Sequence, residues 1–495
     1  MISTPARILA VCALLSLSGM PAVAQAQAQI SIGLQQEPTT LDPTMDATAS
    51  INVMLTQNVY EGLTTVDETG TVQPQLARAW EVLEDGLTWR FHLHEGVRFH
   101  SGAPLTSAEV LFSFERARGE GATNPRRATF QVIESLSAPD EHTVEIVLER
   151  PDAFFLFDLA QGPAVIVHPD TAETNAQRPD GTGPFRFDAW TRGDRLRLVK
   201  NPDHRNAGNV ALDAVTFRFI SEPAAATAAL LAGELDAFPG FPAPELVAQF
   251  EADPRFNVQI SSTEGEVILA MNNSRAPFTD LEFRRGVSHA LDRDEIIEGA
   301  MYGFAVPNGT FFPPHHPAWV DLTDRYPHDP DIARELIAGS VHDGRRLTMR
   351  LPPFPYAQRS GEIIQAQLAA AGLDVAIESV EWGFWLDEVF NNRNYDFTII
   401  AHTSPNDLGN FARGPEYFYG YEDAEFEALW AAIRTETDED ARNELLRQAQ
   451  THVTEQAVHG FLFQLAAIGI FRDGVGGFWE SQPVLYLPLS EITLR

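Results

Sequence analysis

Cysteine, lysine and long apolar runs are scarce in this sequence. Cys12 is the single cysteine, so the chain beyond it has no thiol with which to form a disulfide or bind a metal. Lys200 is the single lysine, and 35 basic residues face 69 acidic ones, which gives a net charge of -34. Because phosphate backbones and anionic lipids repel such a chain, we expect no nucleic-acid partner and no anionic membrane surface as a partner.

The most apolar stretch lies at the amino terminus. Arg7 precedes an apolar run at residues 8–17, and small residues follow around Ala24. This order is typical of a secretory signal peptide, to which we assign residues 1–26. No later stretch approaches the ~20 apolar residues of a transmembrane helix, so we expect a soluble periplasmic protein. A lipid anchor on Cys12 is the alternative.

Strand, helix, strand patterns occur in both halves of the chain. The first pattern spans residues 215–240, and the second spans 346–380 and is followed by a further strand at 395–403. Each half can therefore build its own α/β layer. The length after the leader is sufficient for two or three lobes, so the fold class we predict is α/β with two lobes and a cleft.

A strand, a turn and a capped helix follow one another near residue 100. Apolar and polar residues alternate over 87–94, which predicts a half-buried strand. Thr106 and Glu109 have the spacing of a capping box, in which each side chain accepts a hydrogen bond from an amide of the first helical turn. A helix is therefore predicted to begin directly after Thr106.

Several segments carry a family resemblance. They are "LDP" at Leu41, the run around the capped helix, "GTGPFRF" from Gly181, "LLAGELDAF" from Leu230 and "MNNSRAPFTDLEFRRGVSHALDRDEII" from Met271. In this order they resemble the extracytoplasmic solute-binding proteins of peptide and nickel ABC transporters, which form family 5, or cluster C. The resemblance covers nearly the whole chain after the leader.

The resemblance implies a periplasmic-binding-protein fold of the type II kind. Lobe I is then expected at 27–265 with an inserted subdomain at about 71–185, lobe II at 266–471, and a return to lobe I at 472–495. The two crossings between lobes act as a hinge around a ligand cleft. We expect a monomer that captures a small solute and delivers it to an ABC permease and its ATPase subunits.

Signatures of enzymes are missing from the sequence. It has no phosphate-binding loop, no dinucleotide fingerprint, no "HExxH" and no "GxSxG". We therefore predict no catalytic residues, no cofactor, no resident metal and no enzyme activity. A peptide, or a peptide-like or amino-acid-derived compound, is the leading ligand. A nickel complex, haem or an oligosaccharide is the alternative, and a secreted enzyme or sensor is the most distant one.

Two groups of residues are predicted to contact the ligand in addition to the loop that follows residues 395–403. Trp382 and Trp385 follow a strand of the second half, and loops at the carboxyl ends of such strands open onto the cleft. Either indole can stack on the ligand, and core packing is the alternative for each. In lobe I, the resemblance implies that the loop from Thr44, with Met45 and Thr48, offers backbone groups to the ligand.

The loop after residues 395–403 supplies the remaining predicted ligand contacts. It carries His402, Ser404, Asp407 and Arg413. Relatives that bind dipeptides hold the ligand ammonium with an aspartate in this loop, and the shared "D..NF" pattern places Ser404 at that position. Asp407 then becomes the candidate partner of a cation, and Arg413 the candidate partner of a carboxylate or phosphate.

Histidines offer a second interpretation of the site. Nickel-carrying relatives use a histidine in the general region of His402, but a lone histidine is more often a packed or hydrogen-bonding residue. Adjacent histidines such as His315 and His316 seldom chelate one ion, and the neighbouring prolines indicate a surface loop. We therefore interpret these histidines as structural.

Overall fold

The protein is described here by a computed structural model. It covers Met1 and residues 28–46, 48–404 and 407–495. Apart from Met1, the predicted signal peptide at 1–26 lies outside the described residues. Across the part that is described, no helix is both long and apolar enough to cross a membrane.

One 12-stranded mixed sheet runs through both lobes. In spatial order its main path is β15 (Val375–Ser379), β14 (Leu347–Leu351), β16 (Phe397–His402), β12 (Phe256–Met271), β17 (His459–Arg472), β11 (Ala237–Phe238), β1 (Gln29–Leu34), β10 (Ala214–Phe219), β9 (Arg195–Lys200) and β8 (Phe185–Thr191). Off this path, β13 (Ala305–Pro307) pairs with β17, and β19 (Ser481–Gln482) pairs with β12. β12 and β17 have 16 and 14 residues, so both are long enough to extend from one lobe into the other.

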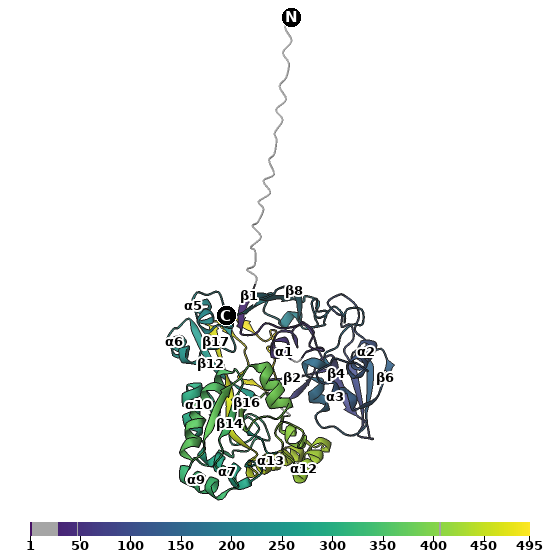
Figure 1. Ribbon diagram of the computed structural model, residues 1–495. Helices are drawn as coiled ribbons and strands as arrows, with labels where there is room; N and C mark the ends of the chain where they lie inside the picture. Colours follow the sequence, from purple (N-terminus) through teal and green to yellow (C-terminus); the bar gives the residue numbers. More distant parts are fainter. Residues whose placement is uncertain (2–27, 47, 405–406) are drawn as a thin grey trace.

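Lobe I is the part of this sheet from β11 to β8 together with the elements packed on it. Its helices are α1 (Ala49–Leu55), α5 (Pro223–Leu231) and α6 (Val247–Glu251). The carboxyl-terminal segment returns to this lobe, because Leu489 and Ile492 are buried in the same core as Ile32 and Phe217. Figure 1 accordingly shows the C-terminus beside β1.

A separate four-stranded antiparallel sheet lies beside lobe I. Its order is β4 (Ala77–Val82), β5 (Thr88–Leu93), β7 (Thr143–Leu148) and β6 (Ile133–Asp140), and the associated helices are α2 (Ser107–Arg118), α3 (Arg127–Gln131) and α4 (Phe155–Leu159). The predicted strand and capping box are confirmed. The Thr106 amide donates to Glu109 Oε2 at 2.8 Å, and the Thr106 hydroxyl accepts from the Ala108 amide at 3.2 Å.

Lobe II repeats the α/β arrangement that its sequence pattern predicts. Parallel strands β14 and β15 are joined through α10 (Pro355–Ala370), and Ile364 and Leu368 of that helix pack on Leu347, Met349 and Leu351. The other long helices are α7 (Leu281–Ala290), α8 (Arg293–Met301), α9 (Pro330–Gly339), α12 (Ala424–Thr435) and α13 (Glu439–Glu455). Figure 1 shows α7, α9 and α10 in the green half of the molecule, away from β1 and β8.

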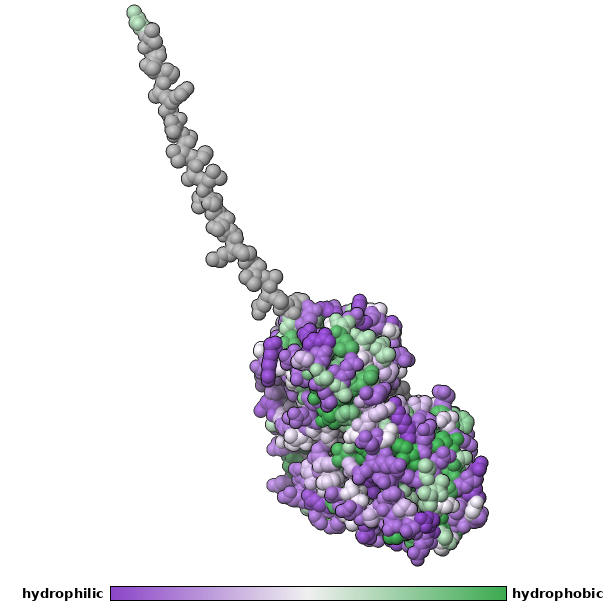
Figure 2. Space-filling model, turned by 90° about the vertical axis from the view of Figure 1, so that its left-hand side faces the viewer, coloured by the Kyte–Doolittle hydropathy of each residue, from purple (hydrophilic) through white to green (hydrophobic). Residues whose placement is uncertain are grey.

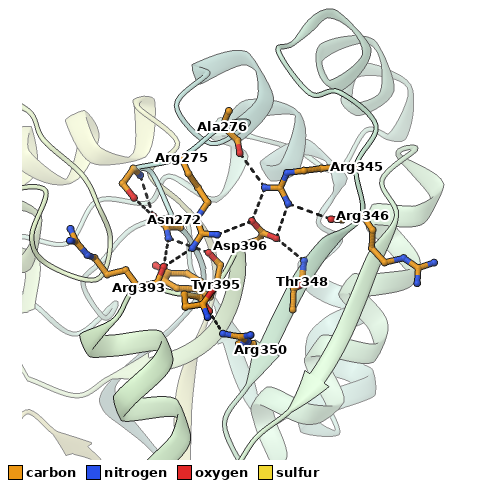
Figure 3. Close-up of polar contacts among 12 residues, drawn as sticks. Asn272, Arg275, Ala276, Arg345, Arg346, Thr348, Arg350, Arg393, Tyr395 and Asp396 are labelled. Carbon is orange, nitrogen blue, oxygen red and sulfur yellow. Dashed lines mark hydrogen bonds and ion pairs between the residues drawn. The ribbon is translucent and has the colours of Figure 1, made fainter.

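Asp396 is a buried acid that links several segments at the end of lobe II that lies away from lobe I. It precedes β16, whose other end at His402 pairs with Glu266. Figure 3 shows the arginines around it: Arg345 donates to both carboxylate oxygens, at 2.8 and 3.1 Å, and Arg275 lies 3.8 Å away. The Thr348 amide completes the set at 2.9 Å. This buried acid is therefore matched by cations of the chain itself.

The crossing between lobes contains a β-bulge. In the β12–β17 ladder, Ser262 is opposite Ala466, but Glu266 is opposite Gln464, so the register shifts between these pairs. Beyond the shift, β12 also pairs with β16 of lobe II. We call residues 262–266 the hinge segment. Bulges of this kind bend a strand and redirect its side chains, which suits a segment between two lobes.

One face of the molecule is mostly hydrophilic. Figure 2 shows hydrophilic residues over most of one face, with apolar residues gathered in separate small groups. A surface with this excess of acidic groups keeps a protein soluble without giving it a particular partner.

Candidate interlobe ligand site

The lobes contact one another through the α4 region and α12. Arg434 forms an ion pair with the buried carboxylate of Asp152, and its backbone oxygen accepts from the Ala153 amide at 2.8 Å. Next to this pair, Phe154 stacks on Trp430 with 5.7 Å between ring centres and 18° between planes. These contacts join the two lobes on one side of their boundary.

A small cavity lies at this boundary below the predicted ligand loop. It has a volume of about 130 Å³, and Ser404, Thr403, Asn52, Arg126, Gln161, Pro163, Val484, Leu485 and Tyr486 line it. Arg126 reaches from lobe I to within 3.5 Å of the Ser404 hydroxyl. Arg126 also lies 3.7 Å from Asp158, where burial raises the carboxyl pKa to about 6 against the opposing effect of this arginine.

Three of the predicted ligand residues lie together in that loop. Asp407 Oδ2 accepts from the Ser404 amide at 3.2 Å and lies 3.4 Å from His402 Nδ1. The other ring nitrogen of His402 contacts the Tyr419 hydroxyl at 2.9 Å. The carboxylate thus contacts both the Ser404 amide and the imidazole of His402, while 23% of the Asp407 side chain stays exposed.

Arg413 extends the same group toward the surface. Asn410 links it to the loop, because Asn410 donates to Asp407 at 3.1 Å and accepts from Arg413 at 3.5 Å. The guanidinium lies over the Tyr417 ring, 4.0 Å from its centre. Arg413 is exposed and has no carboxylate partner among the residues described, so its positive charge is available to an anionic group.

The predicted tryptophans have different environments. Trp385 is 3% exposed, and its indole N–H donates to Thr398 at 2.9 Å, so it belongs to the core of lobe II. Trp382, in α11 (Trp382–Phe384), is 39% exposed and stacks on Trp385 with ring centres 5.0 Å apart. Trp385 therefore positions Trp382, and neither ring forms part of the two interlobe cavities.

Met45 and Thr48 lie in lobe I before α1. Met45 is exposed, whereas the Thr48 hydroxyl donates to Asp46 at 2.6 Å. Neither side chain lines either interlobe cavity. Asn52, one helical turn after Thr48, is the residue of this segment that reaches the smaller one.

A larger cavity of about 360 Å³ lies between the subdomain of lobe I and α13 of lobe II. About half of its lining residues are apolar or aromatic, with Trp80, Phe154, Leu156, Phe157 and Leu446 among them. The polar groups include Glu264, His315, Glu439 and Arg442. Aromatic and aliphatic walls with several polar groups, in a volume of this size, are typical of a site for a small molecule.

The hinge segment supplies the most deeply buried charges near the site. His315 Nε2 lies 2.6 Å from Glu264 Oε1, and its Nδ1 contacts the Ser262 hydroxyl at 2.7 Å. Burial raises the pKa of Glu264, and nearby Asp407 adds to this effect while His315 opposes it. Burial, Glu264 and Asp407 together raise the pKa of Glu266 well above its usual value.

Sequence reasoning missed the two hinge glutamates and assigned His315 to a surface loop. The structure instead places His315 against Glu264 in a cavity wall, with 17% of its side chain exposed. A signal for the glutamates was present in "EGEVILAM", where two acids stand at the start of an apolar run. Acidic residues are almost never fully buried without a partner, so an acid that enters such a strand needs an explanation.

Histidine and acidic side chains of the described residues form no group of three or more that could hold a metal ion. His315 and His316 both line the larger cavity, but their rings have different contacts, because His315 meets Glu264 and Ser262. His316 instead stacks on Phe312 with 4.1 Å between ring centres. Its burial lowers the imidazole pKa to about 4, and the neighbouring charges of His315 and Arg442 act in the same direction.

Comparison with known proteins begins with a family model. The model of the bacterial extracellular solute-binding proteins, family 5, matches residues 71–421. A probable di/tripeptide-binding protein 5 of Pseudomonas aeruginosa is 29% identical over 83% of this chain and 85% of its own length. The dipeptide-binding protein of Escherichia coli is 28% identical over 79% of this chain and 80% of its own.

A solved structure shows the same fold. The dipeptide-binding protein of Pseudoalteromonas sp. SM9913, in complex with Met-Leu, superposes with a TM-score of 0.81 at 21% identity. The match covers 94% of this chain and 100% of that one. The predicted two-lobed α/β fold is therefore confirmed.

Proposed function

The chain belongs to the bacterial extracellular solute-binding proteins of family 5, and on that premise we propose that it binds a peptide-like solute between its two lobes. Membership confirms the predicted solute-binding class and the prediction that the protein is not an enzyme. The nature of the solute, the transport partners and the cellular location belong to the proposal.

The observation that carries the proposal is the cavity of about 360 Å³ between the lobes. Its aromatic and aliphatic walls suit apolar side chains, while Glu264 and Arg442 place charges of opposite sign in the same enclosure. A short peptide has this combination, with an ammonium, a carboxylate and apolar side chains. Di- and tripeptides are also what the relatives are named for.

The ligand loop supports the same class of solute. Asp407 and Arg413 are joined through Asn410, and each keeps an exposed portion that can meet an ionic group. Trp382, held by Trp385, adds an exposed aromatic face on lobe II. Met45 and Thr48 remain proposed contacts from lobe I, through backbone groups of their loop.

Closure of the lobes around the ligand distinguishes the loaded protein from the empty one. A ligand that touches both lobes stabilises the closed form, because it loses half of its contacts when they separate. We infer that a monomer in this closed form, in the periplasm, docks on an ABC permease that is driven by ATPase subunits. The contacts of Arg434 with Asp152 and Ala153 then form part of the closed state.

The first experiment identifies the bound solute directly. The protein is purified from its native cells without refolding, and native mass spectrometry measures any added mass before and after acid release. A released compound with peptide bonds or amino-acid units is the expected result. A nickel complex, haem, an oligosaccharide or persistently empty protein that no di- or tripeptide stabilises against heat would overturn the peptide proposal.

A second experiment tests Asp407. If it meets the ligand ammonium, Asp407→Asn weakens binding of a dipeptide such as Met-Leu by about tenfold in calorimetry. Glu416→Gln is the matched control, because Glu416 forms an exposed ion pair with Arg393 on the same side of the lobe. An affinity that stays unchanged in Asp407→Asn contradicts the role of this carboxylate.

A further inference from the structure

Neither of the two buried glutamates of the hinge segment forms an ion pair with an arginine or lysine of the described residues. Glu264 and Glu266 are 5% and 2% exposed. Glu264 Oε2 has no hydrogen-bond partner in the part of the chain that the structure describes, although its other oxygen meets His315. Glu266 forms no ion pair with an arginine, lysine or histidine of the described residues, although His402 is opposite it in the β12–β16 ladder. Glu264 and Asp407 are the charged groups that raise its pKa.

The groups around this pair come from several elements and are mainly acidic. Glu264 and Glu266 lie on β12, Asp407 on η6 (Asp407–Ala412), and the two histidines on neighbouring segments are His315 and His402. His315 shares its ring between Glu264 and Ser262, and His402 shares its ring between Asp407 and Tyr419. Three carboxylates therefore face two histidines that other groups already engage.

The unpartnered oxygen of Glu264 belongs to a residue of the cavity wall. Glu264 and His315 both line the 360 Å³ cavity, whose walls combine apolar and aromatic residues with other polar ones. Arg442 and Glu439, from α13, are the other charged groups of that wall. A carboxylate that is removed from water and lacks a partner costs several kcal/mol unless a cation joins it. No arginine or lysine of the described residues pairs with Glu264, and His315 meets only one of its two oxygens, so the ligand is the candidate source of a cation for the other.

We propose that the 360 Å³ cavity between the lobes contains a subsite for a cationic group of the solute, an ammonium or a guanidinium. This group binds against Glu264, and the charges of Glu266 and Asp407 add to the attraction. The inference rests on the proposed function and narrows it to solutes with a positive charge enclosed by apolar surface. It also gives the hinge a role in recognition, because the strand that joins the lobes carries the subsite. The cation can come from a peptide's amino terminus or from a basic side chain.

Four dipeptide probes distinguish these two sources of positive charge. Leu-Arg has both cations, Leu-citrulline keeps only the ammonium, N-acetyl-Leu-Arg keeps only the guanidinium, and N-acetyl-Leu-citrulline has neither. We expect at least one probe with a cation to bind tenfold or more tightly than N-acetyl-Leu-citrulline in calorimetry at low salt. Loss on acetylation assigns the subsite to the amino terminus, and loss on citrulline substitution assigns it to the side chain. Equal affinities for all four overturn the subsite.

Variants of the full chain locate the effect. Glu264→Gln keeps the shape of the side chain and removes its charge, so the preference for the charged probe is expected to fall at least tenfold. Glu282→Gln, whose carboxylate pairs with Arg285 on the surface of α7, is the control and should retain the preference. A preference that persists in Glu264→Gln overturns the assignment. If that variant does not fold, the four probes and the proton measurement on the unaltered chain decide the question.

Proton release is a second readout that a purely structural role would not produce. Burial favours protonation of the free hinge carboxylates, so an entering cation should displace a proton. Binding enthalpies of Leu-Arg in phosphate and in Tris at pH 7 should then differ by the number of protons released multiplied by the difference between the ionisation enthalpies of the two buffers. Identical enthalpies in the two buffers contradict the subsite.

Agmatine separates failure of the subsite from failure of the proposed function. It carries a guanidinium and an ammonium but no peptide bond. If no dipeptide binds but agmatine does, the peptide proposal fails and the cation subsite stands. If dipeptides bind without regard to charge, the subsite fails and the peptide proposal stands. If neither dipeptides nor agmatine bind, both fail.

Discussion

Glu61 in lobe I and Glu266 at the hinge are equally buried, at 2% exposure each, but their surroundings are opposite. Arg205 donates to both oxygens of Glu61, at 2.6 and 2.9 Å, and His204 lies 3.5 Å away. Burial alone would raise the pKa of Glu61, but these cations outweigh it and hold that pKa at about 2. Around Glu266 the neighbouring charges are acidic, and its pKa is raised well above the usual value.

The difference in neighbouring charges distinguishes a buried acid that stabilises the fold from a buried acid that is available to bind a ligand. Asp396 with Arg345 (Figure 3) and Asp152 with Arg434 follow the pattern of Glu61. Each of these buried carboxylates receives an arginine from elsewhere in the chain. The hinge glutamates depart from it in a protein that has arginines available. A buried charge left unmatched at the meeting of two lobes is a common property of functional sites.

The largest expected effect is on Glu61. We predict that Glu61→Gln lowers the free energy of unfolding at pH 7 by about 3 kcal/mol, because a pKa of about 2 in the fold replaces an ordinary value of 4.5. This stabilisation is complete above pH 4.5 and disappears as the pH falls toward 2. Urea unfolding of both proteins measures it. A variant as stable as the parent at pH 7 would remove the contrast with Glu266.

Local sequence patterns correctly predicted several helices and strands of the protein. The alternation over 87–94 and the Thr106–Glu109 spacing depend only on neighbours in sequence, and both appear as expected in β5 and α2. The strand, helix, strand unit of lobe II was predicted for the same reason. The resemblance to the family then supplied the two-lobed arrangement that local patterns cannot specify.

The site was less accessible from sequence because its geometry depends on distant contacts. His402, Ser404 and Asp407 are close in sequence, and they do meet. Glu264 and His315 are 51 residues apart and come together only through the bulge of β12 and the loop after β13. The interlobe partners Asp152 and Arg434 are 282 residues apart. No periodicity in a single sequence predicts such pairings.

Glu266→Gln should change stability in the opposite direction to Glu61→Gln. Since the folded pKa of Glu266 is raised, its charged form opposes folding at neutral pH and stops doing so as the pH falls toward 4.5. We therefore expect the ligand-free variant to be about 1–2 kcal/mol more stable at pH 7, which is a rise of about 1–2 °C in melting temperature for a chain of this length. Thermal unfolding at pH 7 and pH 4.5 tests this. A loss of stability at pH 7 would show that Glu266 already has its counter-charge in the free protein.

Arg434→Ala tests whether the matched pair Asp152–Arg434 serves closure. Removing the guanidinium leaves Asp152 buried near Asp158 without its partner across the boundary, which favours separation of the lobes. We expect the affinity for a bound dipeptide to fall about fivefold, or about 1 kcal/mol. Arg346→Ala is the control, because its ion pair with Asp374 is exposed and lies within lobe II. Equal affinities in the two variants would make the Asp152 pair structural, like that of Glu61.

The smallest expected effect belongs to Trp382. Its ring is exposed and stacked on Trp385, but it lies outside the walls of both interlobe cavities. Trp382→Ala should therefore weaken dipeptide binding by less than about threefold, which corresponds to a stacking contact of about 0.5 kcal/mol at an exposed site. Calorimetry measures the affinity, and Trp385→Phe serves as the comparison because it changes the support of the ring rather than the ring itself. If Trp382→Ala weakens binding tenfold, the aromatic face of lobe II contributes as much to dipeptide affinity as the hinge glutamates are expected to. The main recognition contact would then be the Trp382 ring.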